Sequence, residues 1–173
     1  MKICSLLLCL VLLLSGCSAA APVWETVDDV MPAQPAGSWL DQASTILIGV
    51  PEGLELLASA DGYCLYGDPS GDYEVETSIY LASGLDSAVR QLSGYDADRL
   101  LIIETTRFNL PEYHFAWYSE TEEGGRLNQA DLVLDGTSCY AVVCSSLEAS
   151  GNAYDQETRQ VFSSFGLYFD EGV

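Results

Sequence analysis

The sequence has very few basic residues. Its 173 residues include one lysine, Lys2, and five arginines, against 26 aspartates and glutamates. A charge balance of this sign repels nucleic acid and anionic lipid head groups. We therefore expect no nucleic-acid partner and no polybasic attachment to a membrane. A neutral or basic protein, or a small-molecule ligand, is compatible with such a surface.

Motifs that carry chemistry are also lacking. The chain has no Gly-x-Ser-x-Gly turn for a nucleophile, no Cys-x-x-Cys pair and no glycine loop for phosphate. The only histidine, His114, alternates with Tyr113 and Phe115 along a predicted strand, so it shares a face with Ala116 and Tyr118. This pattern is typical of a surface or half-buried strand position. We therefore expect no catalytic residue and no enzymatic activity.

The cysteines are arranged in a way that disfavours a metal site. Besides Cys17 and two cysteines in the leading apolar run, the chain has Cys64, Cys139 and Cys144. The last two are five residues apart on one predicted strand, so they face opposite sides at a separation of about 16 Å. We expect no metal ligands and no cofactor. If a disulfide forms, it joins Cys64 to Cys139 or to Cys144, and the sequence leaves both pairings open.

The N-terminus has the pattern of an export signal. Lys2 precedes a largely apolar run from Ile3 to Leu14, which is shorter than the roughly 20 residues of a spanning helix. The run ends in Leu14-Ser15-Gly16-Cys17, which resembles the lipobox of bacterial lipoprotein precursors. That resemblance implies a helical signal peptide over residues 1–16 and a lipid on Cys17. The lipid would hold the protein at the extracytoplasmic face of the cell membrane.

Composition divides the remaining chain into a tether and a domain. Residues 17–42 contain three prolines and no sustained periodicity, so they predict the lipidated cysteine followed by a flexible tether. Residues 43–173 predict a single globular domain. Removal of the signal would leave 157 residues with a formal charge of −21, five positive against 26 negative. A chain of this length can bury a full core without a disulfide.

Short apolar segments separated by turn residues predict strands in two blocks, each followed by a helix. The strand segments are 46–50, 54–59, 63–66, 73–82, 100–108, 113–120, 130–134 and 137–144. The first helix runs over Leu85–Leu92, with Ser83 as its N-cap and Gly94 at its end. The second follows a cap at Asn152 and ends at Gly166.

The pair Asp135-Gly136 between two apolar segments is a strong hairpin signal. A two-residue loop would pair Leu134 with Thr137 and Leu132 with Cys139. One core face of the hairpin then carries five residues: Leu132, Leu134, Cys139, Ala141 and Val143. Tyr140, Val142 and Cys144 would fall on the opposite face.

Acidic residues gather in two predicted turns. Asp68, Asp72 and Glu74 surround Gly71, and a second group lies at Glu120–Glu123. Oxygen ligands in a tight loop can take Ca²⁺, but the segment around Gly71 does not match the helix-flanked calcium loop. We interpret both groups as solvated hairpin tips.

The order of elements resembles that of the PsbP-like domains. The resemblance rests on an early hairpin, a helix, an antiparallel meander and a final helix ending in Val161-Phe162-Ser163-Ser164-Phe165. It implies an α+β fold and a mostly non-enzymatic role in binding or assembly, and it transfers no site residue. Our predicted fold is an antiparallel sheet of about six to eight strands with two main helices.

The function predicted from these features is a non-enzymatic binding or interaction module, held at the cell envelope by the lipid on Cys17. Two alternatives stay open. One is an envelope hydrolase that uses carboxylates, which would need a carboxyl group with a shifted pKa in a pocket. The other is a low-affinity binder of divalent cations, which would need a set of converging oxygen ligands.

Overall fold

The computed structural model describes residues 45–168. The predicted signal peptide, the lipidated Cys17 and the tether over residues 17–42 lie outside the described residues, so these predictions stay predictions. None of the helices within residues 45–168 is long and apolar enough to cross a membrane.

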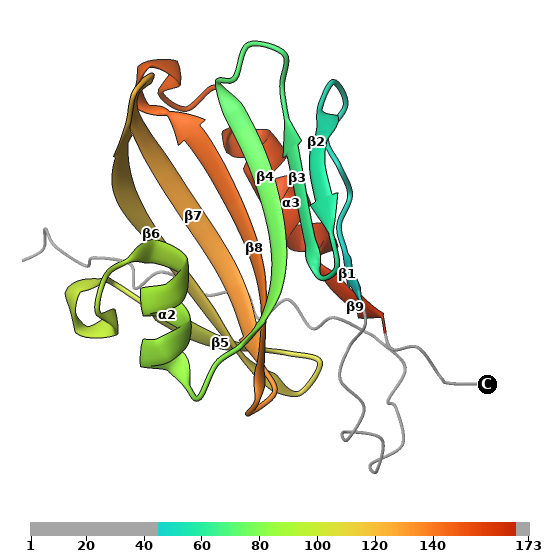
Figure 1. Cartoon of the computed structure of the whole chain (residues 1–173), viewed down its shortest axis with the longest axis vertical. Helices are drawn as coiled ribbons and strands as arrows, with labels where there is room; N and C mark the ends of the chain where they lie inside the picture. Colours follow the sequence, from blue (N-terminus) through green and yellow to red (C-terminus); the bar gives the residue numbers. More distant parts are fainter. Residues whose placement is uncertain (1–44, 169–173) are drawn as a thin grey trace, which may run out of the picture. The chain divides into compact units, whose positions relative to one another are not determined.

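A seven-stranded antiparallel sheet forms the middle layer (Figure 1). Its strands follow the spatial order β2-β3-β4-β8-β7-β6-β5. Their bounds are β2 Glu55–Ala60, β3 Tyr63–Gly67, β4 Tyr73–Leu81, β5 Ile103–Arg107, β6 Leu110–Thr121, β7 Gly124–Leu134 and β8 Ser138–Leu147. The predicted α+β class with an antiparallel sheet and two main helices is therefore confirmed.

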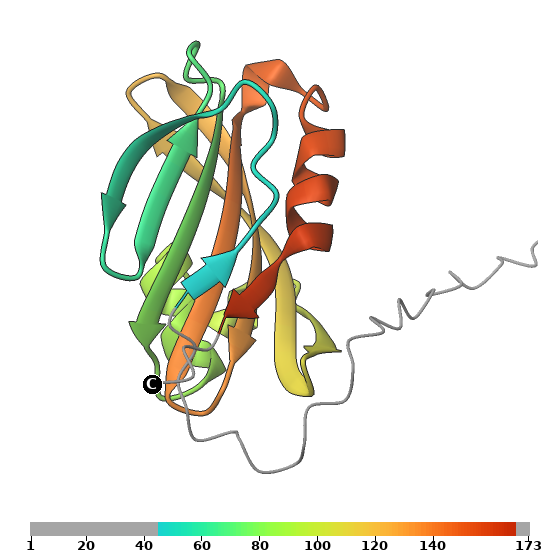
Figure 2. The same cartoon turned by 90° about the vertical axis from the view of Figure 1, so that its right-hand side faces the viewer.

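The two helices cover opposite faces of this sheet (Figure 2). Helix α2 (Leu85–Ser93) packs Ala88 and Val89 on one face, and α3 (Asp155–Ser164) packs Val161 on the other. Short 3-10 turns, η1 (Ala97–Arg99) and η2 (Glu148–Ser150), follow α2 and β8. The domain thus has three layers, with the sheet between α2 and α3.

Both faces of the central strand β8 are buried. Cys139, Ala141 and Val143 share one buried face, as the sequence predicted, and this face packs against α2, while Val142 and Cys144 face α3. The sequence suggested one core face for this hairpin, and the structure shows a core on each side. A strand in the middle of a sheet covered on both faces reads as a continuous apolar run, and this explains the segment Tyr140–Cys144.

The register of the β7–β8 hairpin differs from the prediction. Leu134 pairs with Cys139, and not with Thr137. The carboxylate of Asp135 accepts hydrogen bonds from the backbone N–H groups of Thr137 and Ser138, at 2.9 and 2.7 Å, and this widens the loop. Because the shift is two residues, every side chain keeps its predicted face.

Neither predicted N-cap forms. Helix α2 begins after Gly84 and α3 after Tyr154, and neither start has a side-chain capping bond, so the assignments of Ser83 and Asn152 were wrong. The predicted end of α2 is confirmed, because Gly94 has a left-handed φ of 78° that suits glycine.

The chain after α3 forms a strand that the sequence did not predict. Gly166 does not end α3 as a cap but begins β9 (Gly166–Tyr168), which pairs with β1 (Thr45–Leu47). This two-stranded sheet adds Ile46 and Leu167 to the core beneath α3. Helix α3 and the residue after it bury Thr158, Val161 and Phe165.

A tight hairpin joins β5 to β6. Its two loop residues, Phe108 and Asn109, have φ angles of 54° and 60°, and Arg107 pairs with Leu110. Two positive φ angles in a two-residue loop are typical of a type I′ turn. The strand β6 therefore begins at Leu110, three residues before the predicted strand segment 113–120, and Glu112 is a strand residue that faces α3.

Candidate functional site

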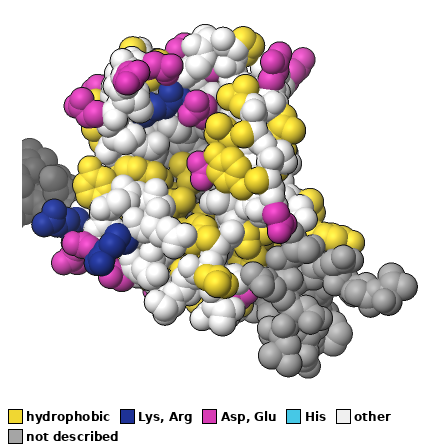
Figure 3. Space-filling model, in the orientation of Figure 1, with side chains coloured by type: hydrophobic (Ala, Val, Ile, Leu, Met, Phe, Trp, Pro, Cys, Tyr) yellow, Lys and Arg dark blue, Asp and Glu magenta, His cyan; other side chains and the backbone are white. Residues whose placement is uncertain are grey.

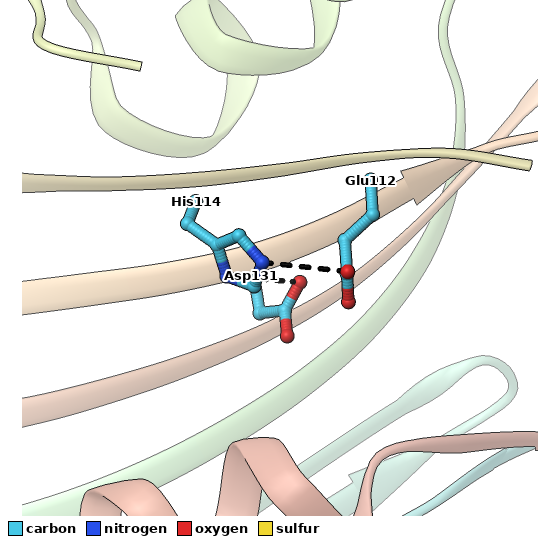
Figure 4. Close-up of side chains that lie close together, drawn as sticks. All are labelled: Glu112, His114 and Asp131. Carbon is cyan, nitrogen blue, oxygen red and sulfur yellow. Dashed lines mark ion pairs between the residues drawn. The ribbon is translucent and has the colours of Figure 1, made fainter. Parts of the chain in front are cut away.

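Charged side chains from three neighbouring strands meet on the α3 face of the sheet. In the register of β6 and β7, His114 lies directly opposite Asp131, and Glu112 is two residues before His114 on the same face. Arg107 of β5 completes the group through ion pairs with Glu112 and Asp131. Figure 4 shows the imidazole beside both carboxylates. We call these four residues the charge cluster.

Arg107 ties the cluster to the last turn of α3. Its guanidinium donates to the carbonyl oxygens of Phe165 and Phe162, at 3.0 and 3.2 Å. The same group lies 5.2 Å from the centroid of the Phe165 ring. A cation at the C-terminal end of a helix is favourable because the last carbonyls carry partial negative charge. Arg107 therefore links the β5–β6 hairpin to α3.

Each nitrogen of His114 faces a different carboxylate. Nε2 lies 3.4 Å from Oε2 of Glu112, and Nδ1 lies 3.5 Å from Oδ1 of Asp131. The hydroxyl of Thr105 lies 3.1 Å from Nε2 and donates to Glu112 at 2.6 Å. The side chain of His114 is 34% exposed, whereas those of Glu112 and Asp131 are 6% and 0% exposed.

The surroundings of His114 and Asp131 favour the protonated form of each group. Burial lowers the pKa of His114, but the hydrogen bond to Glu112 and the charge of Asp131 outweigh burial, so the net pKa is raised above 6.5. Complete burial raises the pKa of Asp131, and the opposing charges of His114 and Arg107 do not cancel this effect. With Arg107 positive and Glu112 negative, one proton shared by His114 and Asp131 makes the cluster neutral.

The carboxyl group of Glu112 behaves in the opposite way. Burial raises its pKa, but hydrogen bonds from His114, Thr105 and Arg107 outweigh burial, and the net pKa is lowered. Glu112 is therefore the permanent anion of the cluster and the partner of Arg107.

Glu112, His114 and Asp131 are also the one group among residues 45–168 with the spacing of a metal site, their ligand atoms lying within 4.8 Å of one another. Two features oppose an ion there. The two imidazole nitrogens point to different carboxylates, so a single nitrogen does not face both. Arg107 already pairs with both carboxylates, and its positive charge would repel a cation. The geometry favours a buried ionic network.

A groove lies on the opposite face of the sheet, beside the C-terminal end of α2. It has a volume of about 400 Å³ and is lined by residues of α2 and of five strands, β3, β4, β8, β7 and β6. In Figure 3 hydrophobic side chains gather across this face, with acidic side chains beside a basic one near its upper edge. Helix α2 covers only part of the sheet, and this leaves the groove open.

The polar floor of the groove is held by a complete hydrogen-bond network. Arg126 is 5% exposed and donates to Ser145 at 3.1 Å and to the carbonyl oxygen of Gly71 at 3.1 and 3.2 Å. It also pairs with Glu74 at 3.2 Å. Asn128 accepts from Ser145 at 2.8 Å and donates to Ser119 at 2.9 Å. These bonds fix the shape of the floor before any ligand arrives.

Of the residues considered in the sequence, His114 belongs to the charge cluster. His114 is half-buried on the predicted face, and its partners Arg107, Glu112 and Asp131 were missed. The alternation of β6 could have joined Glu112 to His114, but the partnership with Asp131 depends on the β6–β7 register. Cys17 lies outside the described residues.

The three described cysteines, Cys64, Cys139 and Cys144, are all free. The predicted opposite orientation of Cys139 and Cys144 is confirmed, since they belong to different cores. In the acidic loop after β3, Asp68 accepts from the backbone N–H of Tyr73 at 2.9 Å and from the hydroxyl of Ser70. Its oxygens thus stabilise the turn.

No protein-family model matches the chain, and no curated protein is detectably similar to it in sequence. Several solved structures are similar in fold. A crystal structure from Bacteroides thetaiotaomicron matches with a TM-score of 0.50 and 12% identity, over 73% of this chain. The match spans 46% of the Bacteroides chain, so the present chain covers about half of its length.

Two further structures match at slightly lower TM-scores. The solution structure of cyanobacterial PsbP (CyanoP) from Synechocystis matches with a TM-score of 0.48 and 12% identity, over 80% of this chain and 99% of that one. LpqN, involved in cell envelope biogenesis of Mycobacterium tuberculosis, matches with a TM-score of 0.47 and 13% identity, over 74% of this chain and 86% of that one. At these identities the likeness concerns the fold alone.

Proposed function

We propose that the protein is a lipid-anchored binding module at the extracytoplasmic face of a membrane, without catalytic activity, and that the groove beside α2 is its binding site. The observation that carries this proposal is the groove itself. It combines an open concave shape, apolar walls and a polar floor whose hydrogen bonds are complete. Such a combination is typical of sites that bind a ligand with little rearrangement.

The location of the titratable groups supports binding over hydrolysis. His114 and Asp131 lie on the α3 face, so neither reaches a ligand in the groove. Asp131 is the acid with the most strongly raised pKa, which is the feature that favours the alternative of a carboxylate hydrolase. Its side chain is 0% exposed and faces Arg107 and His114, so it cannot contact a substrate.

The lipid anchor is tested on the N-terminus. Mass spectrometry of the mature protein from its native host should show a diacylglycerol-modified Cys17 as the first residue. The Cys17→Ala variant should be unmodified and unprocessed at that bond. An unmodified Cys17 in the wild-type mature protein would overturn the anchored part of the proposal.

The binding role is tested in intact cells. A photo-crosslinking amino acid in place of Leu65, which lines the groove, should capture a partner or ligand. The same amino acid in place of Leu101, which is 84% exposed and does not line the groove, is the matched control and should capture none. Turnover of an envelope substrate by the purified chain, lost on His114→Gln, would contradict the proposal.

A further inference from the structure

One carboxylate of the groove has no cationic partner. Arg126 is the only basic residue among those that line the groove. Its donors are engaged by Ser145, the carbonyl of Gly71 and Glu74, with Glu123 at 3.6 Å. Its positive charge is therefore used within the floor and is not available to neutralise a second acid or to bind an anionic ligand.

Glu76 is that second acid. It comes from β4, two residues after Glu74 and on the same face, and it lines the groove. No ion pair within residues 45–168 includes it. Burial raises the pKa of Glu76, the nearby Ser78 hydroxyl opposes this effect, and the charge of Glu74 adds to it. An incoming cation would compensate the burial of this carboxylate.

The walls of the groove suit an apolar body attached to such a cation. Trp117 of β6 contributes an aromatic ring, and Leu65, Leu92 and Val143 contribute aliphatic surface from β3, α2 and β8. A tryptophan ring offers a large apolar surface to the body of a ligand. The volume of about 400 Å³ falls in the range of sites for small organic molecules.

We propose that this groove binds a small organic ammonium compound, with its charged nitrogen at Glu76 and its apolar part against Trp117 and the aliphatic walls. The proposal rests on the proposed function, because it names the class of ligand for the same groove. Charge complementarity selects this class, since the free charge in the groove is negative and the whole chain carries a formal charge of −20.

The test uses three compounds of one shape and different charge: phenethylamine, phenethyl alcohol and hydrocinnamate. Each is titrated into the full chain in nonionic detergent, and binding is followed by two-dimensional NMR of the backbone amides. Phenethylamine should bind at least about tenfold more tightly than the alcohol, since a charge-assisted contact exceeds a neutral one by that order. Shifts should concentrate in β4, β6 and the end of α2, and hydrocinnamate should not bind.

Variants separate the contributions of charge and ring. Glu76→Gln should weaken phenethylamine binding about tenfold and leave the alcohol unaffected. Trp117→Leu should weaken both compounds. Glu120→Gln is the control, since Glu120 is an exposed acid of β6 that faces away from the groove. Changed folding of any variant would appear in its own amide spectrum, recorded first without ligand.

The outcomes distinguish this inference from the proposed function. Equal binding of the amine and the alcohol, unchanged by Glu76→Gln, would overturn the ammonium proposal and leave the groove as a binding site. Absence of any amide shift with phenethylamine would also overturn it. The crosslinking at Leu65 would still decide the proposed function independently.

Discussion

Arg107 contacts Phe165 in two ways, through a 3.0 Å hydrogen bond to its carbonyl oxygen and through its ring, whose centroid lies 5.2 Å from the guanidinium carbon. The two residues are 58 positions apart in the chain. Arg107 is the last residue of β5 in the edge hairpin β5–β6, and Phe165 directly follows α3. The charge cluster is therefore a structural connection between the edge of the sheet and the helix that covers it.

This connection predicts a large effect of removing Arg107. Arg107→Met leaves Glu112 and Asp131 buried without their cation, and we expect the free energy of unfolding to fall by about 3–5 kcal/mol. Urea denaturation followed by circular dichroism measures the change. Arg90→Met is the matched control, because Arg90 also pairs with two carboxylates but is 59% exposed. Its loss should cost less than about 1 kcal/mol, and an equal effect of both substitutions would contradict the role of burial.

The proton shared by His114 and Asp131 predicts a pH dependence of stability. Both pKa values are raised on folding, so the folded state holds more protons than the unfolded chain at neutral pH. The stability due to the imidazole is fully present below its ordinary pKa of 6.5 and is lost as the pH rises through the higher folded value. The stability due to Asp131 depends on pH in the same direction, and it decreases as the pH rises above the ordinary pKa of 3.8. Glu112 has the opposite sign, and its contribution is lost only as the pH falls below 4.5.

We therefore expect the melting temperature to fall as the pH rises above neutral. Asp131→Asn removes the buried acid and should flatten this decline. Asp98→Asn, at an exposed aspartate of η1, should leave the decline unchanged. Differential scanning calorimetry over a pH series gives the slopes. A decline of equal slope in the wild type and in Asp131→Asn would count against the shared proton.

The presence of Arg107 in the cluster predicts that zinc does not stabilise the protein. Millimolar Zn²⁺ or EDTA should leave the melting temperature of the wild-type chain unchanged, because Arg107 pairs with both carboxylates and would repel a second cation. If Zn²⁺ raised the melting temperature and His114→Gln abolished that rise, the result would instead show a metal site at Glu112, His114 and Asp131. The expectation from the sequence that the chain has no metal ligands would then be wrong.

Burial predicts unequal reactivity of the three described cysteines. It raises the pKa of the Cys139 and Cys144 thiols to about 12, and hydrogen bonds from the tyrosines beside them only partly oppose this. A thiol-reactive disulfide reagent should modify the half-buried Cys64 in the native protein and reach the other two only after unfolding. Peptide mapping after brief labelling reports the sites. Fast labelling of Cys144 in the native state would contradict the packing of β8.

The sequence predicted the class of fold well, because the alternation of apolar residues is a local property. The strand of His114 and the two faces of β8 followed from periodicity alone. Features that depend on individual hydrogen bonds to the backbone could not be predicted from the periodicity. The loop of Asp135 is two residues wider than the dipeptide Asp135-Gly136 suggested, since the aspartate oxygen accepts two backbone N–H groups.

The candidate sites were harder to predict for the same reason. Asp131 lies 17 positions after His114, and only the β6–β7 register brings the two together. The groove has no motif, because its lining comes from α2 and five strands. Glu76 is ordinary in the sequence and becomes informative only once Arg126 is seen to pair with Glu74.

The pairing of β1 with β9 sets Thr45 directly opposite Tyr168. The ends of the described chain therefore meet, and a short peptide could join them without crossing the groove strands β4 and β6. New ends could be opened at the exposed Gly136 in the β7–β8 loop. A circularly permuted protein of this kind should keep both cores, because every strand pair of the seven-stranded sheet except the β7–β8 hairpin would keep its connection. The packing of the domain would then not depend on the position of the chain ends.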